Sequence, residues 1–214
     1  FGRTLATAVR YGARRIVVHL GAVSEPPGQE ARRLAFELTS RCAAGQAGSP
    51  RYRELLAALD AEMSCLEQER SERIVAMLFQ LGLRASREGA QLAVETAYHP
   101  YELPRPPAMR NILDALSGEP VGAWLDTGHV SAQSHLGVAN QASWIDAVRG
   151  RWLGAHLHDA VGLRDHLVAG IGTVDFAPAL AALPPDAVLT CEFDWYFSPR
   201  EVRDGRERIE RMMA

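Results

Sequence analysis

Acidic and histidine side chains recur at nearly even intervals along this chain. The recurring residues are His19, Glu95, Asp126, His156 and Glu192, and the last four are 31, 30 and 36 residues apart. Carboxylates mixed with imidazole suit Mn²⁺, Mg²⁺, Co²⁺ or Zn²⁺ better than a thiolate-seeking metal. Three carboxylates brought together without a cation would repel one another and be costly to bury. The residue types therefore predict a divalent metal site, provided that the fold brings them together.

Each of these residues lies near the end of a short apolar segment that is rich in β-branched residues. The five segments are residues 15–20, 91–97, 121–126, 152–158 and 187–192. Continuous rather than alternating hydrophobicity is typical of parallel strands that are covered on both faces. In a parallel α/β barrel the C-terminal strand ends open onto one mouth, where active sites are built. We therefore expect an α/β fold in which the five strand ends converge on one point.

The segments between the predicted strands favour helices. Helical patterns cover residues 4–13, 107–116, 142–149 and 198–213, and a long amphipathic helix is expected over 51–83. Its charged residues, which include Glu67, are expected to form a solvated face. Residues 22–50 are rich in Gly, Pro, Ala and Ser, which predicts a long loop with a short helix around 30–39. Because this loop begins at the predicted mouth, we expect it to act as a lid.

Composition narrows the classes of function. The 214 residues, 47% of them hydrophobic, are enough for one globular domain over 1–214. All 23 basic residues are arginine, so mechanisms that need a lysine amine, such as Schiff-base or pyridoxal-phosphate catalysis, are excluded. The net charge of −3 gives no electrostatic argument for a nucleic-acid partner. Three scattered cysteines and the lack of an apolar run of about 20 residues favour a cytoplasmic protein without a membrane span.

Several motifs, taken in order, resemble a known family. The segments VVHLG, LAVETAY, LDTGHV, HLHD, GIGTVDF and TCEFD resemble the signature of the xylose isomerase-like TIM barrel superfamily. That superfamily includes sugar and sugar-phosphate isomerases and epimerases, inosose dehydratases and endonuclease IV-type enzymes. The resemblance covers about residues 4–213 and implies a (β/α)8 barrel of which only strands four to eight are present. The first three βα units are then expected to be absent from this sequence, cleaved, or supplied by another chain.

The resemblance also implies roles for individual residues. A divalent metal would be held by Glu95, Asp126, Glu192 and a histidine of HLHD, with His19 as a further candidate ligand. The motif favours His156 over His158 as that histidine, but both lie on one strand face, and the choice stays open. Glu95 and Glu192 would pass a proton as base and acid through an enediolate of a sugar or sugar phosphate.

The substrate implied by the resemblance is a small sugar or sugar derivative. The residues expected to contact it are His129, His158, Arg164, His166 and Trp195. An arginine at this position would suit a phosphate or carboxylate, because a neutral sugar needs none. Whether the protein forms a homo-oligomer is left open.

Two alternatives remain. An endonuclease IV-like phosphodiesterase acting on abasic DNA would need three metals, and His19, His129 and His166 fall where its extra histidines would lie. However, the position two residues before His166 is Arg164 rather than aspartate, and no basic stripe for a DNA backbone is evident. The second alternative is a barrel homologue that retains the metal residues without catalysis.

Overall fold

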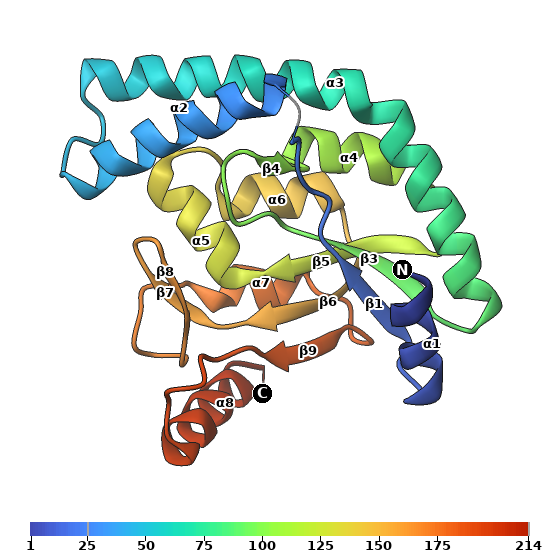
Figure 1. Cartoon of the computed structure of the whole chain (residues 1–214). Helices are drawn as coiled ribbons and strands as arrows, with labels where there is room; N and C mark the ends of the chain where they lie inside the picture. Colours follow the sequence, from blue (N-terminus) through green and yellow to red (C-terminus); the bar gives the residue numbers. More distant parts are fainter. Residues whose placement is uncertain (25, 214) are drawn as a thin grey trace.

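Five parallel strands form the central sheet of this protein (Figure 1). A computed structural model describes residues 1–24 and 26–213. The strands lie in the order β1 (Arg15–Val18), β3 (Gln91–Glu95), β5 (Val121–Asp126), β6 (Trp152–Leu157) and β9 (Val188–Cys191). They confirm the five predicted strands, several of which are shorter than expected at their ends. The sheet curls as half of a barrel, with β1 and β9 as its two edges.

The strand register aligns the C-terminal ends of neighbouring strands. Glu95 on β3 pairs with Trp124 on β5, and Asp126 on β5 pairs with His156 on β6. The pairing of β5 with β6 shifts register after Ala123, so that Trp124 pairs with Gly154. As a result, Glu95, Asp126 and His156 come from the C-terminal ends of three adjacent strands, at one end of the sheet.

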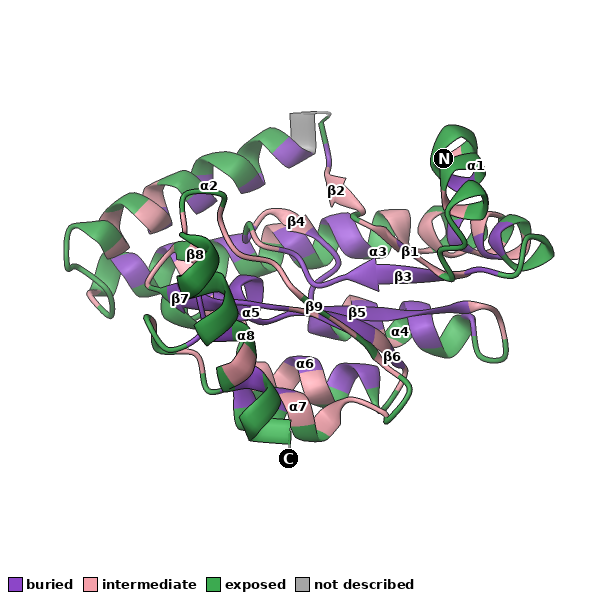
Figure 2. Ribbon diagram, turned by 90° about the horizontal axis from the view of Figure 1, so that it is seen from below, coloured by how far each residue is buried: buried purple, intermediate pink, exposed green. Residues whose placement is uncertain are grey.

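The middle of the sheet is the centre of the core. Every residue of β5 is buried, and so are four of the five residues of β3 (Figure 2). The helices that follow the strands include α4 (Pro106–Ala115), α6 (Gln141–Val148), α7 (Phe176–Ala182) and α8 (Pro199–Met213), and α1 (Gly2–Arg10) precedes β1. Burying a large apolar side chain contributes roughly 1.5–3 kcal/mol, so the buried residues of β3 and β5 stabilise the sheet beneath the strand ends.

Residues 22–50 are mostly helical, so the prediction of a long loop was wrong, whereas the helix expected around 30–39 is present as part of a longer one. Residues Pro26–Ala43 form α2, which packs along α3 (Pro50–Arg87). Ala31, Leu34 and Leu38 are buried in one cluster with residues of α3, and this periodic apolar face outweighs the Gly and Pro content of the segment ends. The prediction of a lid depended on a long loop in this range, so it loses that support. Residue 25 of the same range lies outside the residues that the structure describes. No helix in 1–24 or 26–213 has both the length and the apolar character needed to cross a membrane.

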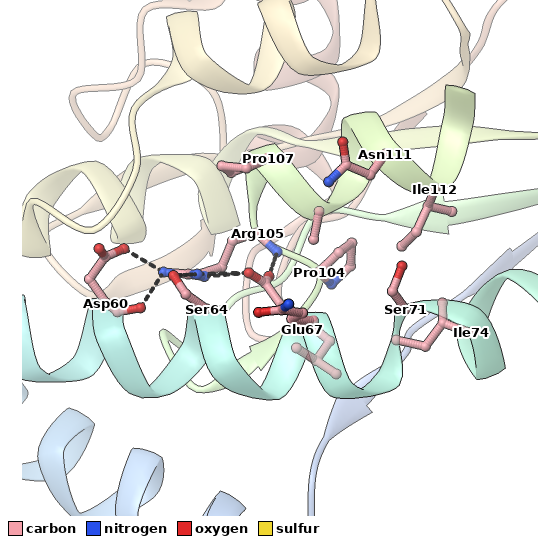
Figure 3. Close-up of a pocket in the computed structure, with 13 residues that line it drawn as sticks. Asp60, Ser64, Glu67, Ser71, Ile74, Pro104, Arg105, Pro107, Asn111 and Ile112 are labelled. Carbon is pink, nitrogen blue, oxygen red and sulfur yellow. Dashed lines mark hydrogen bonds and ion pairs between the residues drawn. The ribbon is translucent and has the colours of Figure 1, made fainter. Parts of the chain in front are cut away.

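A buried ion pair joins α3 to the start of α4. Arg105 donates to both carboxylate oxygens of Glu67 (Figure 3). Its side-chain Nε and Nη2 donate to Glu67 Oε2 at 3.1 and 2.7 Å, and its backbone N–H donates to Oε1 at 2.7 Å. It also donates to Asp60 and Ser64 of α3. A cavity of about 460 Å³ lies beside this network. Glu67 is therefore buried rather than part of the solvated face expected from its charge run.

Several short elements were not predicted. They are α5 (Thr127–Leu136), the hairpin of β7 (Asp159–Val161) and β8 (Arg164–Leu167), the small pair β2 (Gly21–Ala22) and β4 (Glu102–Leu103), and α7. Each of β2, β4, α5 and β7 follows a strand of the central sheet in the chain. These elements therefore build up the end of the sheet where the acidic residues lie.

Candidate active site

Four side chains from four strand ends meet at one point. One ligand atom each from Glu95, Asp126, His156 and Glu192 lie within 4.8 Å of one another. Glu95 ends β3, Asp126 ends β5, His156 lies in β6, and Glu192 directly follows β9. The structure thus brings together the four residues that the sequence singled out as metal ligands.

A single nitrogen of His156 faces all three carboxylates. Its Nδ1 is 2.8 Å from Glu95 Oε1, 3.0 Å from Glu192 Oε2 and 3.7 Å from Asp126 Oδ2. Burial opposes a charged imidazole, but hydrogen bonds to Asp126, Glu192 and Glu95 raise the pKa of His156 to about 11. Burial likewise opposes ionised Glu95, yet hydrogen bonds from His156 and His19 hold its pKa below the ordinary value. At neutral pH this cluster therefore consists of carboxylates around a proton on His156.

The D-T-G-H motif places Asp126 at the junction of β5 and α5. Asp126 is the N-cap of α5, and its Oδ1 accepts the backbone N–H of His129 at 2.8 Å. Thr127 Oγ1 bonds to the backbone of His158 in both directions, donating to its carbonyl and accepting from its N–H. A Cβ on Gly128 would lie 2.1 Å from His158 Cε1. In this motif Asp126 caps helix α5, Thr127 hydrogen-bonds to the backbone after β6, and Gly128 leaves the space that the His158 ring occupies.

His158 supports Asp126. Its ring has no exposed surface; Nε2 lies 2.9 Å from Asp126 Oδ1, and Nδ1 lies 2.8 Å from the backbone nitrogen of His166. Because the His166 N–H can only donate, Nδ1 must accept, and the ring proton is on Nε2, pointing to Asp126. Both nitrogens are then used within the protein, which favours His156 as the metal ligand and leaves no face of His158 for the predicted substrate contact. The second candidate ligand group, His158, His166 and Glu192, is weakened for the same reason.

His129 presents one ring nitrogen, Nε2, to the site. Its Nδ1 is 2.9 Å from the carbonyl oxygen of Thr96, which can only accept, so the proton is on Nδ1. Nε2 is the ring nitrogen that faces the site, 3.7 Å from Asp126 Oδ2 and 4.0 Å from Asp165 Oδ2. This geometry is consistent with the predicted contact between His129 and a substrate hydroxyl.

His19 lies beside the four-residue group rather than within it. Its Nε2 is 2.9 Å from Glu95 Oε2, on the oxygen not used by His156. The hydrogen bond to Glu95 raises the pKa of His19 even though burial opposes the charge. Its side chain is 59% exposed. In this arrangement His19 is a hydrogen-bonding partner of Glu95, and the predicted role as metal ligand has no support from the ligand distances.

The three remaining predicted substrate residues lie along the β7–β8 hairpin and the loop after β9. The His166 ring stacks on His158 with 4.3 Å between centroids, and its Nε2 is 3.9 Å from Glu192 Oε2. Arg164 instead donates to the Tyr196 hydroxyl at 2.8 Å, and Trp195 is 90% exposed. The structure therefore brings His166 to the site but places Arg164 and Trp195 at its outer margin, where their substrate roles stay predictions.

Sequence reasoning missed two residues that shape the site. Asp165 lies 3.1 Å from His166 Nδ1 and beside His129 Nε2. The Tyr98 hydroxyl donates to the carbonyl of Leu163 in the hairpin turn, and its ring packs edge-on against His129 at 5.4 Å. Tyr98 is the last residue of the LAVETAY segment, so the sequence motif could have identified it as a candidate site residue. No sequence motif identified Asp165 as a site residue, because its position depends on the β7–β8 hairpin, which was not predicted.

The donor set fits a divalent cation. Asp126 and Glu95 are buried, and the lowered pKa values of Glu95, Asp126 and Glu192 leave three ionised carboxylates around one point. The imidazolium of His156 offsets only part of that charge. A divalent cation that replaces the His156 proton would contact four ligand atoms and would neutralise more of the carboxylate charge than that proton does. Oxygen and imidazole donors are also the ligands that such ions prefer.

Comparison with known proteins finds likeness in fold. No family model matches the sequence, and no curated protein matches it. A D-tagatose 3-epimerase-like protein has a TM-score of 0.57 and 19% identity, covering 98% of this chain and 65% of that one. A xylose isomerase domain protein from Planctomyces limnophilus has a TM-score of 0.54 and 14% identity, with 97% and 62% covered. The IOLI protein with a binding zinc atom has a TM-score of 0.52 and 15% identity, with 98% and 78% covered.

These structures confirm the predicted fold. The chain has the fold of part of an α/β TIM barrel, with five parallel strands. It spans less than two thirds of the length of the first two structures. That its strands correspond to strands four to eight of a complete barrel stays a prediction.

Proposed function

We propose that this chain carries the active site of a metal-dependent sugar or sugar-phosphate isomerase or epimerase. The observation that carries the proposal is the meeting of four ligand atoms within 4.8 Å at the C-terminal strand ends. Active sites of parallel α/β barrels are built at that end. One structural neighbour is a D-tagatose 3-epimerase-like protein, which is in keeping with this chemistry.

A divalent ion, Mn²⁺, Mg²⁺, Co²⁺ or Zn²⁺, would be held by Glu95, Asp126, His156 and Glu192. When bound, such an ion polarises a carbonyl and its neighbouring hydroxyl, which makes the carbon-bound proton between them more acidic. One structural neighbour is described with a binding zinc atom. His158 would orient Asp126 through its Nε2–H, as residues behind a metal ligand commonly do.

Glu95 and Glu192 are the proposed acid and base. They reach the cluster from β3 and from the end of β9, with β5 and β6 between them in the sheet, so they flank the point where a substrate carbon would sit. The hydrogen bond from His156 holds the pKa of Glu192 below its ordinary value, and Glu95 is held likewise. Both are therefore carboxylates at neutral pH, so either one can accept the substrate proton, and the carboxylic acid formed in that step can then return the proton to the neighbouring carbon. In an epimerisation, where the proton returns from the opposite side, the second glutamate would first have to take up a proton from solvent.

The other proposed contacts bind and orient the sugar. His129 would contact a substrate hydroxyl through Nε2, while its Nδ1–H donates to the Thr96 carbonyl and fixes the ring. His166 would contribute a second polar contact from the hairpin. Arg164 and Trp195 would reach the distal part of a substrate, for which an anionic group would explain the arginine.

Deuterium exchange tests the proposal. The metal-loaded chain, incubated in D₂O with a panel of ketoses and ketose phosphates, is expected to place deuterium at the carbon next to the carbonyl. Glu192→Gln is expected to slow this exchange by roughly 10²- to 10⁴-fold because it removes a proton acceptor. Glu88→Gln, an exposed residue at the opposite end of the strands, is the matched control.

Three outcomes would count against the proposal. Cleavage of an abasic-site duplex by the same preparation would favour the endonuclease alternative. Metal binding without exchange on any sugar would favour a non-catalytic homologue. Failure to bind any of the four ions would remove the basis of both enzyme hypotheses.

A further inference from the structure

The carboxylate of Asp159, the last residue of the HLHD motif, is buried and fully occupied by backbone hydrogen bonds. Oδ1 accepts the N–H groups of Ala160 and Val174 at 2.9 Å each. Oδ2 accepts those of Gly170 and Gly172 at 2.8 and 2.9 Å. Backbone N–H groups that converge in this way form an anion-binding concavity, and here the anion is a side chain of the same chain.

The glycines of the GIGTVDF motif allow this close wrapping. A Cβ on Gly172 would lie 2.4 Å from Asp159 Oδ1 and 2.3 Å from the carbonyl oxygen of Ala160. Gly170 has a φ of +99°, which favours glycine. The two motifs that stand apart in the sequence are therefore the two halves of one structure, which we call the Asp159 cradle (Asp159 and residues 170–174).

The Asp159 cradle closes the base of the β7–β8 hairpin. Asp159 pairs with Leu167 in the strand register, while its side chain holds Gly170 just beyond β8. Everything between these points is hairpin, including Asp165 and His166 at the candidate site. The position of these two residues thus depends on how the base of the hairpin is fastened.

His166 needs such fastening, because its backbone is in the left-handed region with a φ of +55°. A residue other than glycine stays in this region only when its surroundings hold it there. Its N–H donates to His158 Nδ1 at 2.8 Å, and its carbonyl accepts from Asp194 N–H at 2.9 Å. The His166 N–H is in turn what places the ring proton of His158 on Nε2, toward Asp126.

We propose that Asp159 is a positioning residue of the active site, which acts by holding the hairpin so that the His166 N–H fixes the ring of His158 against Asp126. The path runs from the Asp159 cradle to His166, then to His158 and the carboxylate of Asp126, without Asp159 touching a substrate. The proposal rests on the proposed function only in taking the Asp126 cluster as the reacting site.

Two substitutions loosen the cradle in different ways. Asp159→Asn keeps the side-chain shape but turns an NH₂ group toward two N–H donors, so two of the four bonds are lost. Gly172→Ala leaves the carboxylate and pushes the backbone away from it. Asp175→Asn is the control, because Asp175 lies in the same motif and only caps α7 through Ala177 N–H, a role that asparagine fills equally well.

The readouts are the ring ¹⁵N signals of His158 in the metal-free chain and the affinity for Zn²⁺. In the parent chain we expect the Nε2–H form of His158. Both cradle variants are expected to shift these signals toward a mixture of forms and to weaken Zn²⁺ binding about 10- to 100-fold, the usual effect of losing support behind a metal ligand. The control variant is expected to change neither.

A folded cradle variant with unchanged His158 signals and unchanged Zn²⁺ affinity would overturn the proposal. If Asp159→Asn does not fold, Gly172→Ala decides. Loss of fold in both variants also overturns it, because Asp159 would then hold the domain rather than the hairpin. The ring signals need neither metal nor sugar, so a failure of the isomerase assay leaves this test intact.

Discussion

Metal binding at the candidate site should release one proton and strengthen with pH. The proton is the one on His156 Nδ1, which lies 2.8 Å from Glu95 and 3.0 Å from Glu192 and has a pKa of about 11. A metal can use that nitrogen only after the proton has left. At pH 7 the proton's removal costs ~5 kcal/mol, at about 1.36 kcal/mol per pH unit below the pKa. Affinity for Zn²⁺ is therefore expected to rise about ten-fold per pH unit from pH 6 to pH 8.

Calorimetric titrations in buffers of different ionisation enthalpy measure this release directly. We expect about one proton per Zn²⁺ bound. His156→Gln should abolish the release and weaken binding, whereas His135→Gln, an exposed residue of α5, should behave as the parent chain. Zn²⁺ binding with no pH dependence between pH 6 and pH 8 would refute the reasoning, because it would mean that His156 is neutral without metal or is not a ligand.

The same proton affects the stability of the metal-free chain, and the direction follows from its raised pKa. A charged His156 paired with carboxylates stabilises the folded state fully below the ordinary pKa of 6.5. This contribution is lost progressively as the pH rises from 6.5 toward 11. Metal-free protein should thus lose stability over this alkaline range, and bound metal should remove most of that dependence.

Further predictions concern the ion pair, the D-T-G-H glycine and the metal. Arg105→Met should lower the free energy of unfolding by about 3–5 kcal/mol, because it leaves Glu67 buried without its partner; urea denaturation measures this, with the exposed Arg33→Met as a control that should change little. Gly128→Ala should weaken Zn²⁺ binding about 10- to 100-fold, because its Cβ would displace the His158 ring; equal affinity in a competition titration would contradict this. Zn²⁺ at about 100 times its Kd should add ~2.7 kcal/mol of stability and raise Tm by roughly 5–10 °C, reversed by a chelator; an unchanged Tm would argue against a site present only in the folded chain.

The strand ends of the site could be predicted because their signals are local. Apolar runs mark β3, β5 and β6, and parallel pairing then aligns Glu95, Asp126 and His156. The burial of Glu67 could not be predicted, because its partner Arg105 is 38 residues away and its neighbours in α3 are charged. Helix α2 was predicted too short, over 30–39 only, because the Gly and Pro residues at the segment ends were given more weight than the apolar spacing within it.

The choice between His156 and His158 also needed the fold. Residues two apart on a strand share a face, so the motif alone left both as candidates. The difference comes from the His166 N–H, which occupies Nδ1 of His158, and from Gly128, which admits its ring. The first of these depends on an unpredicted hairpin, and the second on the packing of α5 against β7 and β8.

The two edge strands have a consequence for how this chain behaves in concentrated solution. Among the described residues, β1 pairs only with β3, and β9 only with β6, so each has one row of N–H and C=O groups without a strand partner. Such rows are templates for strands of other polypeptides, and neither RIVV nor VLTC carries an internal charge or proline that would discourage pairing. The colloidal stability of the folded chain therefore depends on what covers the free edges of β1 and β9.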